Sequence, residues 1–138
     1  HWAWDRRWPR WSDWRDGVAR LPDPVREWRG LQALASIGLN GPRPLRLLTD
    51  GTPQSPRAAI VMSAVPVSQS LTDMAQCGDL HQLDTFARRS LAVTLMQVAN
   101  RIHQHGLRWR SMKAKHVYPQ RLADDRWRLW LIDCEGIR

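Results

Sequence analysis

Cysteine, membrane-length apolar runs and lysine are all scarce in this 138-residue chain, and each scarcity excludes a class of protein. Its two cysteines, Cys77 and Cys134, have no metal-type spacing and cannot form a disulfide framework, so a reducing compartment is predicted. No apolar run reaches the roughly 18 residues that a membrane-spanning helix needs. The first residues are rich in Trp and Arg, which also argues against a signal peptide.

Lysine is rare in comparison with arginine: two Lys stand against 19 Arg, and the net charge is +8. Arg binds carboxylates and phosphates through paired hydrogen bonds, so this bias suits anionic partners. A GC-rich genome that encodes Arg where Lys would serve explains the excess equally well. Trp and Arg alternate over residues 1–22, which favours either an anchor on anionic lipid or sugar phosphate, or a loop whose tryptophans cap the core.

Hydrophobic periodicity and turn residues predict a mixed set of helices and hairpins. The predicted elements are a helix capped by Asp23 and ended by Gly38, a hairpin of 44–51 and 57–65, a short helix capped by Ser70, a helix over 81–106 whose apolar stripe includes Phe86, and a hairpin of 116–118 and 126–133. Because helices and antiparallel strands follow one another in this way, the predicted class is α+β.

Four segments in this order resemble the lipopolysaccharide core kinases, small bacterial enzymes with a protein-kinase-like fold that phosphorylate heptose or Kdo sugars. They are REWRGLQALASIGLNGPRPL for helix C, RAAIVMSAVPVSQSLTDM for the strand toward the hinge, GLRWRSMKAKHVY for the catalytic loop and LWLIDCEGIR for the magnesium-loop strand. The resemblance implies a partial small lobe over 1–66, made of helix C and antiparallel strands. It implies the first part of the helical large lobe over 67–138, so the chain is expected to be the middle of a kinase-like protein.

The resemblance also implies roles for residues near the C-terminal end. Asp133 ends an apolar strand and is expected to bind the Mg²⁺ that bridges the phosphates of ATP. His116 lies where most protein kinases have an Asn that faces the metal, although imidazole suits Mg²⁺ less well than oxygen does. A second possibility for His116 is a hydrogen bond that orients the loop. Lys115 is expected to neutralise the phosphate being transferred, or else to be a solvated charge.

Nucleotide contacts are implied on the small-lobe side by Glu27, Met62 and Ala64. Glu27 matches the helix-C glutamate that pairs with a strand lysine holding the α- and β-phosphates. That lysine is missing, because the two lysines of the chain lie in the later loop. Met62 and Ala64 lie where the family's strand reaches the hinge.

The catalytic loop departs from the protein-kinase pattern at two positions. Ser111 occupies the place of the aspartate that accepts the proton of the substrate hydroxyl, and Trp109 replaces the expected histidine. Serine cannot serve unaided as a general base at neutral pH. Phosphoryl transfer depends mostly on positioning and electrostatics, so the loss of this base weakens the expected activity without excluding it.

Three functions follow as alternatives. The first is an ATP- and Mg²⁺-dependent sugar kinase of the cytoplasm, in contact with the inner membrane, whose Arg108, Arg110 and Lys115 face the phosphorylated sugar or the γ-phosphate. The second is a catalytically weak or inactive pseudokinase that acts as a binding or stress-response protein, which Ser111 favours. The third, a nucleic-acid binder, rests on the net charge and the Trp/Arg alternation but lacks any recognised module.

Overall fold

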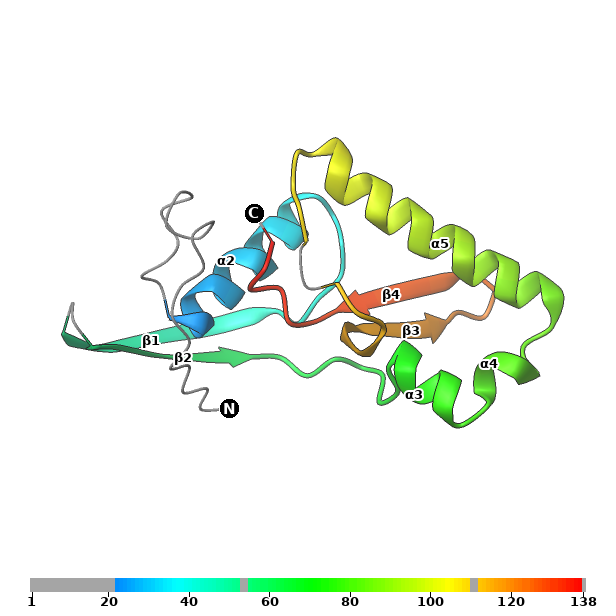
Figure 1. The fold of residues 1–138 in the computed structure, drawn as a ribbon, viewed down its shortest axis with the longest axis horizontal. Helices are drawn as coiled ribbons and strands as arrows, with labels where there is room; N and C mark the ends of the chain where they lie inside the picture. Colours follow the sequence, from blue (N-terminus) through cyan, green and yellow to red (C-terminus); the bar gives the residue numbers. More distant parts are fainter. Residues whose placement is uncertain (1–21, 53–54, 110–111, 138) are drawn as a thin grey trace.

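The computed structural model describes residues 22–52, 55–109 and 112–137 (Figure 1). The elements are α2 (Asp23–Ser36), β1 (Pro44–Thr52), β2 (Ser55–Met62), α3 (Leu71–Gln76), α4 (Asp79–Gln82), α5 (Thr85–Gln104), a 3₁₀ turn η1 (Ala114–His116), β3 (Val117–Arg121) and β4 (Trp127–Leu131). The Trp/Arg stretch up to residue 21, and both Arg110 and Ser111 of the catalytic loop, lie outside the described residues.

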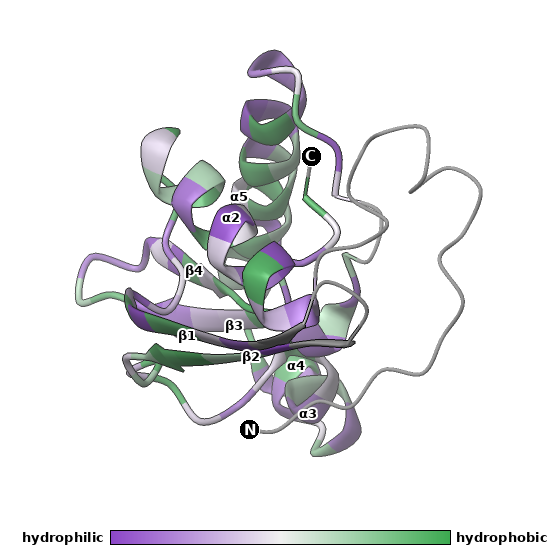
Figure 2. Ribbon diagram, turned by 90° about the vertical axis from the view of Figure 1, so that its left-hand side faces the viewer, coloured by the Kyte–Doolittle hydropathy of each residue, from purple (hydrophilic) through white to green (hydrophobic). Residues whose placement is uncertain are grey.

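The strands form two separate antiparallel hairpins, β1–β2 and β3–β4, as the sequence predicted. Both views show α2 and α5 on one side of the hairpins and α3 and α4 on the other (Figures 1 and 2). The hairpins are joined across the fold, because the backbone N–H of Leu131 in β4 donates to the carbonyl of Asn40, 2.9 Å away, just before β1. The predicted α+β class is therefore confirmed.

Local side-chain capping fixes where α3 and α5 begin. Ser70 and Asp73 form a reciprocal capping box at the start of α3, as the prediction of a Ser70 cap required. At α5, the Asp84 carboxylate accepts a hydrogen bond of 2.7 Å from the backbone N–H of Ala87. The prediction of one helix from residue 81 was therefore wrong at its start, because Leu83 is extended and Asp84 caps a new helix after the short α4.

Helix α2 begins one residue earlier than predicted, and its N-cap position is Pro22 rather than Asp23. Asp23 instead lies in the first turn, where its negative charge interacts favourably with the positive end of the helix dipole. The second hairpin is also shifted: β3 runs to Arg121, into the segment predicted as a polar turn. The hairpin turn itself lies over 122–126, where Asp125 has a positive φ of 61°.

The core is formed where α5 packs on β4, α3 packs on β3, and α2 packs on the β1–β2 hairpin and the segment after β4. Its buried apolar residues are Leu31, Leu34, Ile37, Met74, Ala87, Leu91, Val98, Ile102, Trp109, Val117, Trp127, Leu129, Leu131, Cys134 and Ile137. Apolar and polar residues alternate along α5 in Figure 2, as expected for a helix with one buried face. Phe86, predicted in that face, is 69% exposed, because it lies one residue, about 100°, around the helix from the buried Ala87.

No helix in the described part of the chain has both the length and the hydrophobicity needed to cross a membrane.

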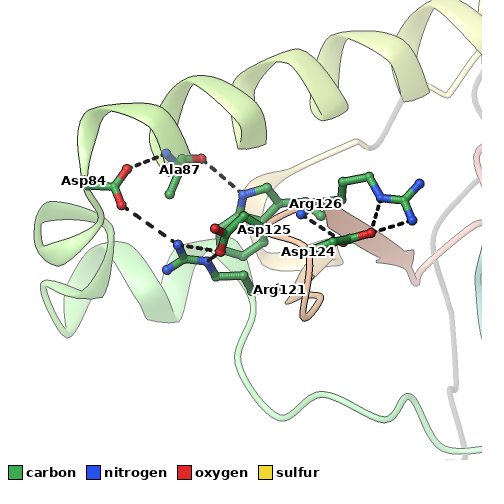
Figure 3. Close-up of polar contacts among 7 residues, drawn as sticks. Asp84, Ala87, Arg121, Asp124, Asp125 and Arg126 are labelled. Atoms are coloured by element: carbon green, nitrogen blue, oxygen red, sulfur yellow. Dashed lines mark hydrogen bonds and ion pairs between the residues drawn. The ribbon is translucent and has the colours of Figure 1, made fainter.

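A buried hydrogen bond anchors the β3–β4 hairpin to the first turn of α5. The indole N–H of Trp127 donates to the carbonyl of Ala87 across 3.1 Å, and both residues are buried. Around it, Figure 3 shows ion pairs at the surface, among them Arg121 with Asp125 at 2.9 Å and Arg126 with Asp124 at 2.6 Å. Exposed ion pairs contribute little to stability, so the indole bond is expected to dominate this contact.

We expect Trp127→Phe to lower the free energy of unfolding by about 1–3 kcal/mol, because a buried carbonyl would lose its indole donor. Asp124→Ala, which breaks an exposed ion pair in the same hairpin, should lower stability much less than Trp127→Phe does. Urea unfolding of both variants measures the difference. Equal costs for the two variants would show that the indole bond is not the main anchor.

Candidate functional site

The candidate site lies at the end of β4, where two of the predicted residues meet. Asp133 follows the strand, and its carboxylate oxygen Oδ2 is 2.9 Å from Nε2 of His116. The backbone holds the same two segments together, since the Ile132 N–H donates to the His116 carbonyl across 3.0 Å. The His116 side chain is buried while the Asp133 side chain is 43% exposed, so the carboxylate is presented to solvent from a fixed base.

Helix α2 forms the second wall of the site. The Glu27 carboxylate accepts hydrogen bonds from the backbone N–H groups of Cys134 and Glu135, directly after Asp133. One turn later, Gly30 lies so close that a Cβ built on it would be 2.0 Å from the Cys134 carbonyl oxygen. A side chain at this position would push α2 and the 133–135 segment apart, so the glycine permits the Glu27 contacts.

Negative charge accumulates between these elements. Burial, and next the charge of Asp133, raise the pKa of Glu27 from 4.5 to about 7, against the effect of its two backbone hydrogen bonds. Glu135 adds further negative charge, although Arg26 lies 3.7 Å from its carboxylate and also pairs with Asp23. Burial, with Glu27 and Asp133, likewise raises the pKa of the Cys134 thiol, which is therefore inert at neutral pH.

The other predicted residues are distributed around this cluster. Lys115 is exposed on η1, next to His116 in the chain. Met62 ends β2 and is 36% exposed, and Ala64 follows it in the linker toward α3, and their predicted nucleotide contacts stay predictions. Ser111 and Arg110 lie outside the described residues, and their predicted roles stay predictions.

Comparison with known proteins identifies the family. The model of the "Lipopolysaccharide kinase (Kdo/WaaP) family" matches residues 13–137. The chain belongs to the lipopolysaccharide kinase (Kdo/WaaP) family. A solved structure described as "WaaP in complex with acyl carrier protein" matches with a TM-score of 0.71 at 18% identity. That match covers 83% of this chain and 49% of the other, so the chain has about half of the WaaP fold. The search of curated proteins found no match.

Membership of a kinase family implies the use of ATP, typically with Mg²⁺. The donor groups at this site fit a magnesium ion in part. Among the described residues, no group of three or more His, Cys, Asp or Glu side chains converges as a metal site. Magnesium does not require one, since it commonly keeps several waters and takes one or two carboxylates together with the phosphates. The pKa of Glu27 is raised first by burial and next by the charge of Asp133, and a cation bound by Asp133 would relieve the second effect.

Two residues of this Kdo/WaaP-family site were not predicted from the sequence as part of it. Gly30 was seen only as part of the α2 pattern, although a glycine inside an amphipathic helix often marks close packing. Trp109 was noted only as a departure from the catalytic-loop pattern. In the structure its indole N–H donates to the backbone carbonyl of Asp133 across 3.3 Å.

We expect Gly30→Ala to lower the free energy of unfolding by about 1–3 kcal/mol, although alanine favours helix formation, because the new methyl group would overlap the Cys134 backbone. Gln32→Ala, at an exposed position of the same helix, should change stability by less than about 0.5 kcal/mol. Urea unfolding provides both values. A Gly30→Ala variant as stable as Gln32→Ala would contradict the close approach.

Replacing Glu27 with Gln should change how stability depends on pH. Because the folded protein holds the Glu27 proton up to about pH 7 and the unfolded chain releases it near 4.5, this residue lowers stability as pH rises through that window. We expect Glu27→Gln to gain about 1–2 kcal/mol relative to the wild type between pH 5 and pH 8, after allowance for partial exposure of the group.

Urea unfolding of both proteins without Mg²⁺, at pH 5, 6, 7 and 8, measures the gain. The difference between the two proteins isolates Glu27 from the other titrating groups. Parallel stability curves for Glu27→Gln and the wild type would show that this carboxyl group has no raised pKa.

Proposed function

We propose that the protein binds Mg·ATP at the Asp133 site and transfers the γ-phosphate to a hydroxyl of a lipopolysaccharide core sugar, heptose or Kdo. One observation carries the proposal: Glu27, His116 and Asp133 come from segments far apart in the sequence and meet at one negatively charged point. Membership of the Kdo/WaaP family supports a sugar kinase over a nucleic-acid binder.

The proposed roles follow from where each group lies. Asp133 would hold Mg²⁺, which when bound would neutralise the charge of the β- and γ-phosphates. His116 is held by Asp133 and by the backbone of η1, so it would orient the carboxylate more readily than replace a water on the metal. Lys115 is exposed on the same turn and could neutralise charge on the transferred phosphate.

On the small-lobe side, Glu27 would take up a lysine ammonium group or remain protonated. Its carboxylate already accepts two backbone N–H groups, so it is fixed in place before nucleotide arrives. Met62, the last residue of β2, and Ala64, on the linker after it, are proposed to contact the adenine. The division into a small lobe over 1–66 and a large lobe over 67–138 is part of the same proposal.

The acceptor is proposed to be an anionic sugar of the lipopolysaccharide core, reached from the cytoplasmic face of the inner membrane. Arg108 is exposed directly before Trp109 and could bind its phosphate groups. The net charge of +8 favours approach to an anionic surface.

A second candidate function is that of a pseudokinase, which binds nucleotide with weak or no transfer. Ser111 favours it, because a general base at this position contributes about 10²–10⁴-fold to rates of this kind. Binding of nucleotide depends on the Asp133 side of the site, whereas transfer also depends on the loop that carries Ser111. Both functions therefore require nucleotide binding, and they differ in whether phosphate is transferred.

We expect saturating Mg·ATP to raise the Tm of the protein by about 5 °C or more, because a ligand that binds only the native state stabilises it. Asp133→Ala should abolish this rise, whereas Asp124→Ala, in the remote β3–β4 turn, should retain it. The rise, rather than the Tm itself, is compared, since Asp133→Ala also relieves repulsion on Glu27. An unchanged wild-type Tm with Mg·ATP would exclude both nucleotide-binding functions.

Transfer is tested separately with ATP labelled in the γ-phosphate and lipopolysaccharide core that contains heptose and Kdo. Labelled sugar that is formed by the wild type and not by Asp133→Ala supports the kinase function. A protein that shows the thermal shift and transfers no label is the pseudokinase.

A further inference from the structure

Trp109 contacts both ends of the segment that follows β4. Its indole Nε1 is 3.3 Å from the Asp133 carbonyl oxygen, and its backbone forms an isolated antiparallel bridge with Ile137. The side chain is buried, with an exposed fraction of 9%. A buried indole N–H normally finds a hydrogen-bond partner, and here that partner is the backbone of the proposed metal-binding residue.

The backbone of Asp133 needs such support. Its φ of 58° lies in the left-handed region, which residues other than Gly rarely adopt unless their surroundings impose it. The backbone groups on both sides of Asp133 already have partners. The Ile132 N–H donates to the His116 carbonyl, and the N–H groups of residues 134 and 135 donate to the Glu27 carboxylate. The carbonyl of Asp133 is held by Trp109.

We propose that Trp109 is a positioning residue, whose indole N–H holds the Asp133 peptide in the left-handed conformation that directs the carboxylate toward His116. The inference rests on the proposed function in assigning Mg·ATP to Asp133. A phenylalanine would keep most of the ring volume and lose the donor. A histidine, the residue that protein kinases have at this position, would keep a ring N–H donor.

The variants are Trp109→Phe and Trp109→His, with Trp130→Phe as the matched control. Trp130 is a half-buried tryptophan of β4 whose indole N–H also makes a hydrogen bond, of 3.1 Å, but to the side chain of Gln120. It therefore reports the cost of losing an indole donor away from Asp133.

The first measurement is amide hydrogen exchange without nucleotide. Exchange at Cys134 and Glu135 should become about tenfold faster in Trp109→Phe, remain unchanged in Trp130→Phe, and return to within about threefold of the wild type in Trp109→His. Unchanged exchange in Trp109→Phe, or equal acceleration in Trp130→Phe, would overturn the proposal. This measurement does not depend on whether the protein binds ATP.

The second measurement is the Kd for Mg·ATP. We expect a rise of about tenfold in Trp109→Phe, and a change of less than about twofold in Trp130→Phe. A Kd for Trp109→Phe equal to that of the wild type would overturn the positioning role. Absence of Mg·ATP binding in the wild type, together with the exchange pattern above, would remove the proposed function and leave the positioning of Asp133 supported.

The wild type offers a further check if Trp109→Phe does not fold. The Trp109 indole proton should exchange with solvent at least about tenfold more slowly than an indole proton in a free tryptophan peptide. Exchange at the peptide rate would overturn the proposal.

Discussion

The close contact between α2 and the Asp133–Glu135 segment is the constraint on which the site depends. Gly30 lets the helix approach the Cys134 backbone, and only at that distance can Glu27 accept the N–H groups of residues 134 and 135. The same segment is held from the other side by His116 and Trp109. Asp133 is therefore fixed between a helix from the first third of the chain and a loop from its last third.

These contacts hold the site in one geometry, but they also bring the carboxylates of Glu27 and Asp133 into unfavourable interaction. Burial, and next the charge of Asp133, raise the pKa of Glu27, so the two carboxylates resist being ionised together. A chain selected only for stability would replace one of them with an apolar or basic residue. Sites that bind cations commonly accept such repulsion, because the bound charge reverses it. The charge of Asp133 next to Glu27 therefore fits the proposed cation at this site.

The sequence predicted the parts of the fold that follow from local patterns. Apolar runs and the turn residues beside them located both hairpins, and Ser70 located the start of α3 because a capping box is complete within four residues. The start of α5 was missed because the helical spacing of apolar residues includes Leu83 and so continues across the helix break at Leu83 and Asp84. Phe86 was misplaced because periodicity gives the face of a helix only to within about one residue.

For the site, the resemblance to a family located Asp133, His116 and Glu27, whereas their contacts could not be predicted from local pattern. Gly30 and Cys134 are far apart in the chain, and nothing in the helix pattern around Gly30 indicates which backbone it will meet. The proposed function thereby separates into two parts. The proposed metal side is assembled by such long-range packing, while the proposed base position is a single residue, Ser111. Under the proposed function, the lack of a base at this position would lower the rate of transfer by about 10²–10⁴-fold while Asp133 keeps its contacts, so nucleotide binding would persist where transfer is lost.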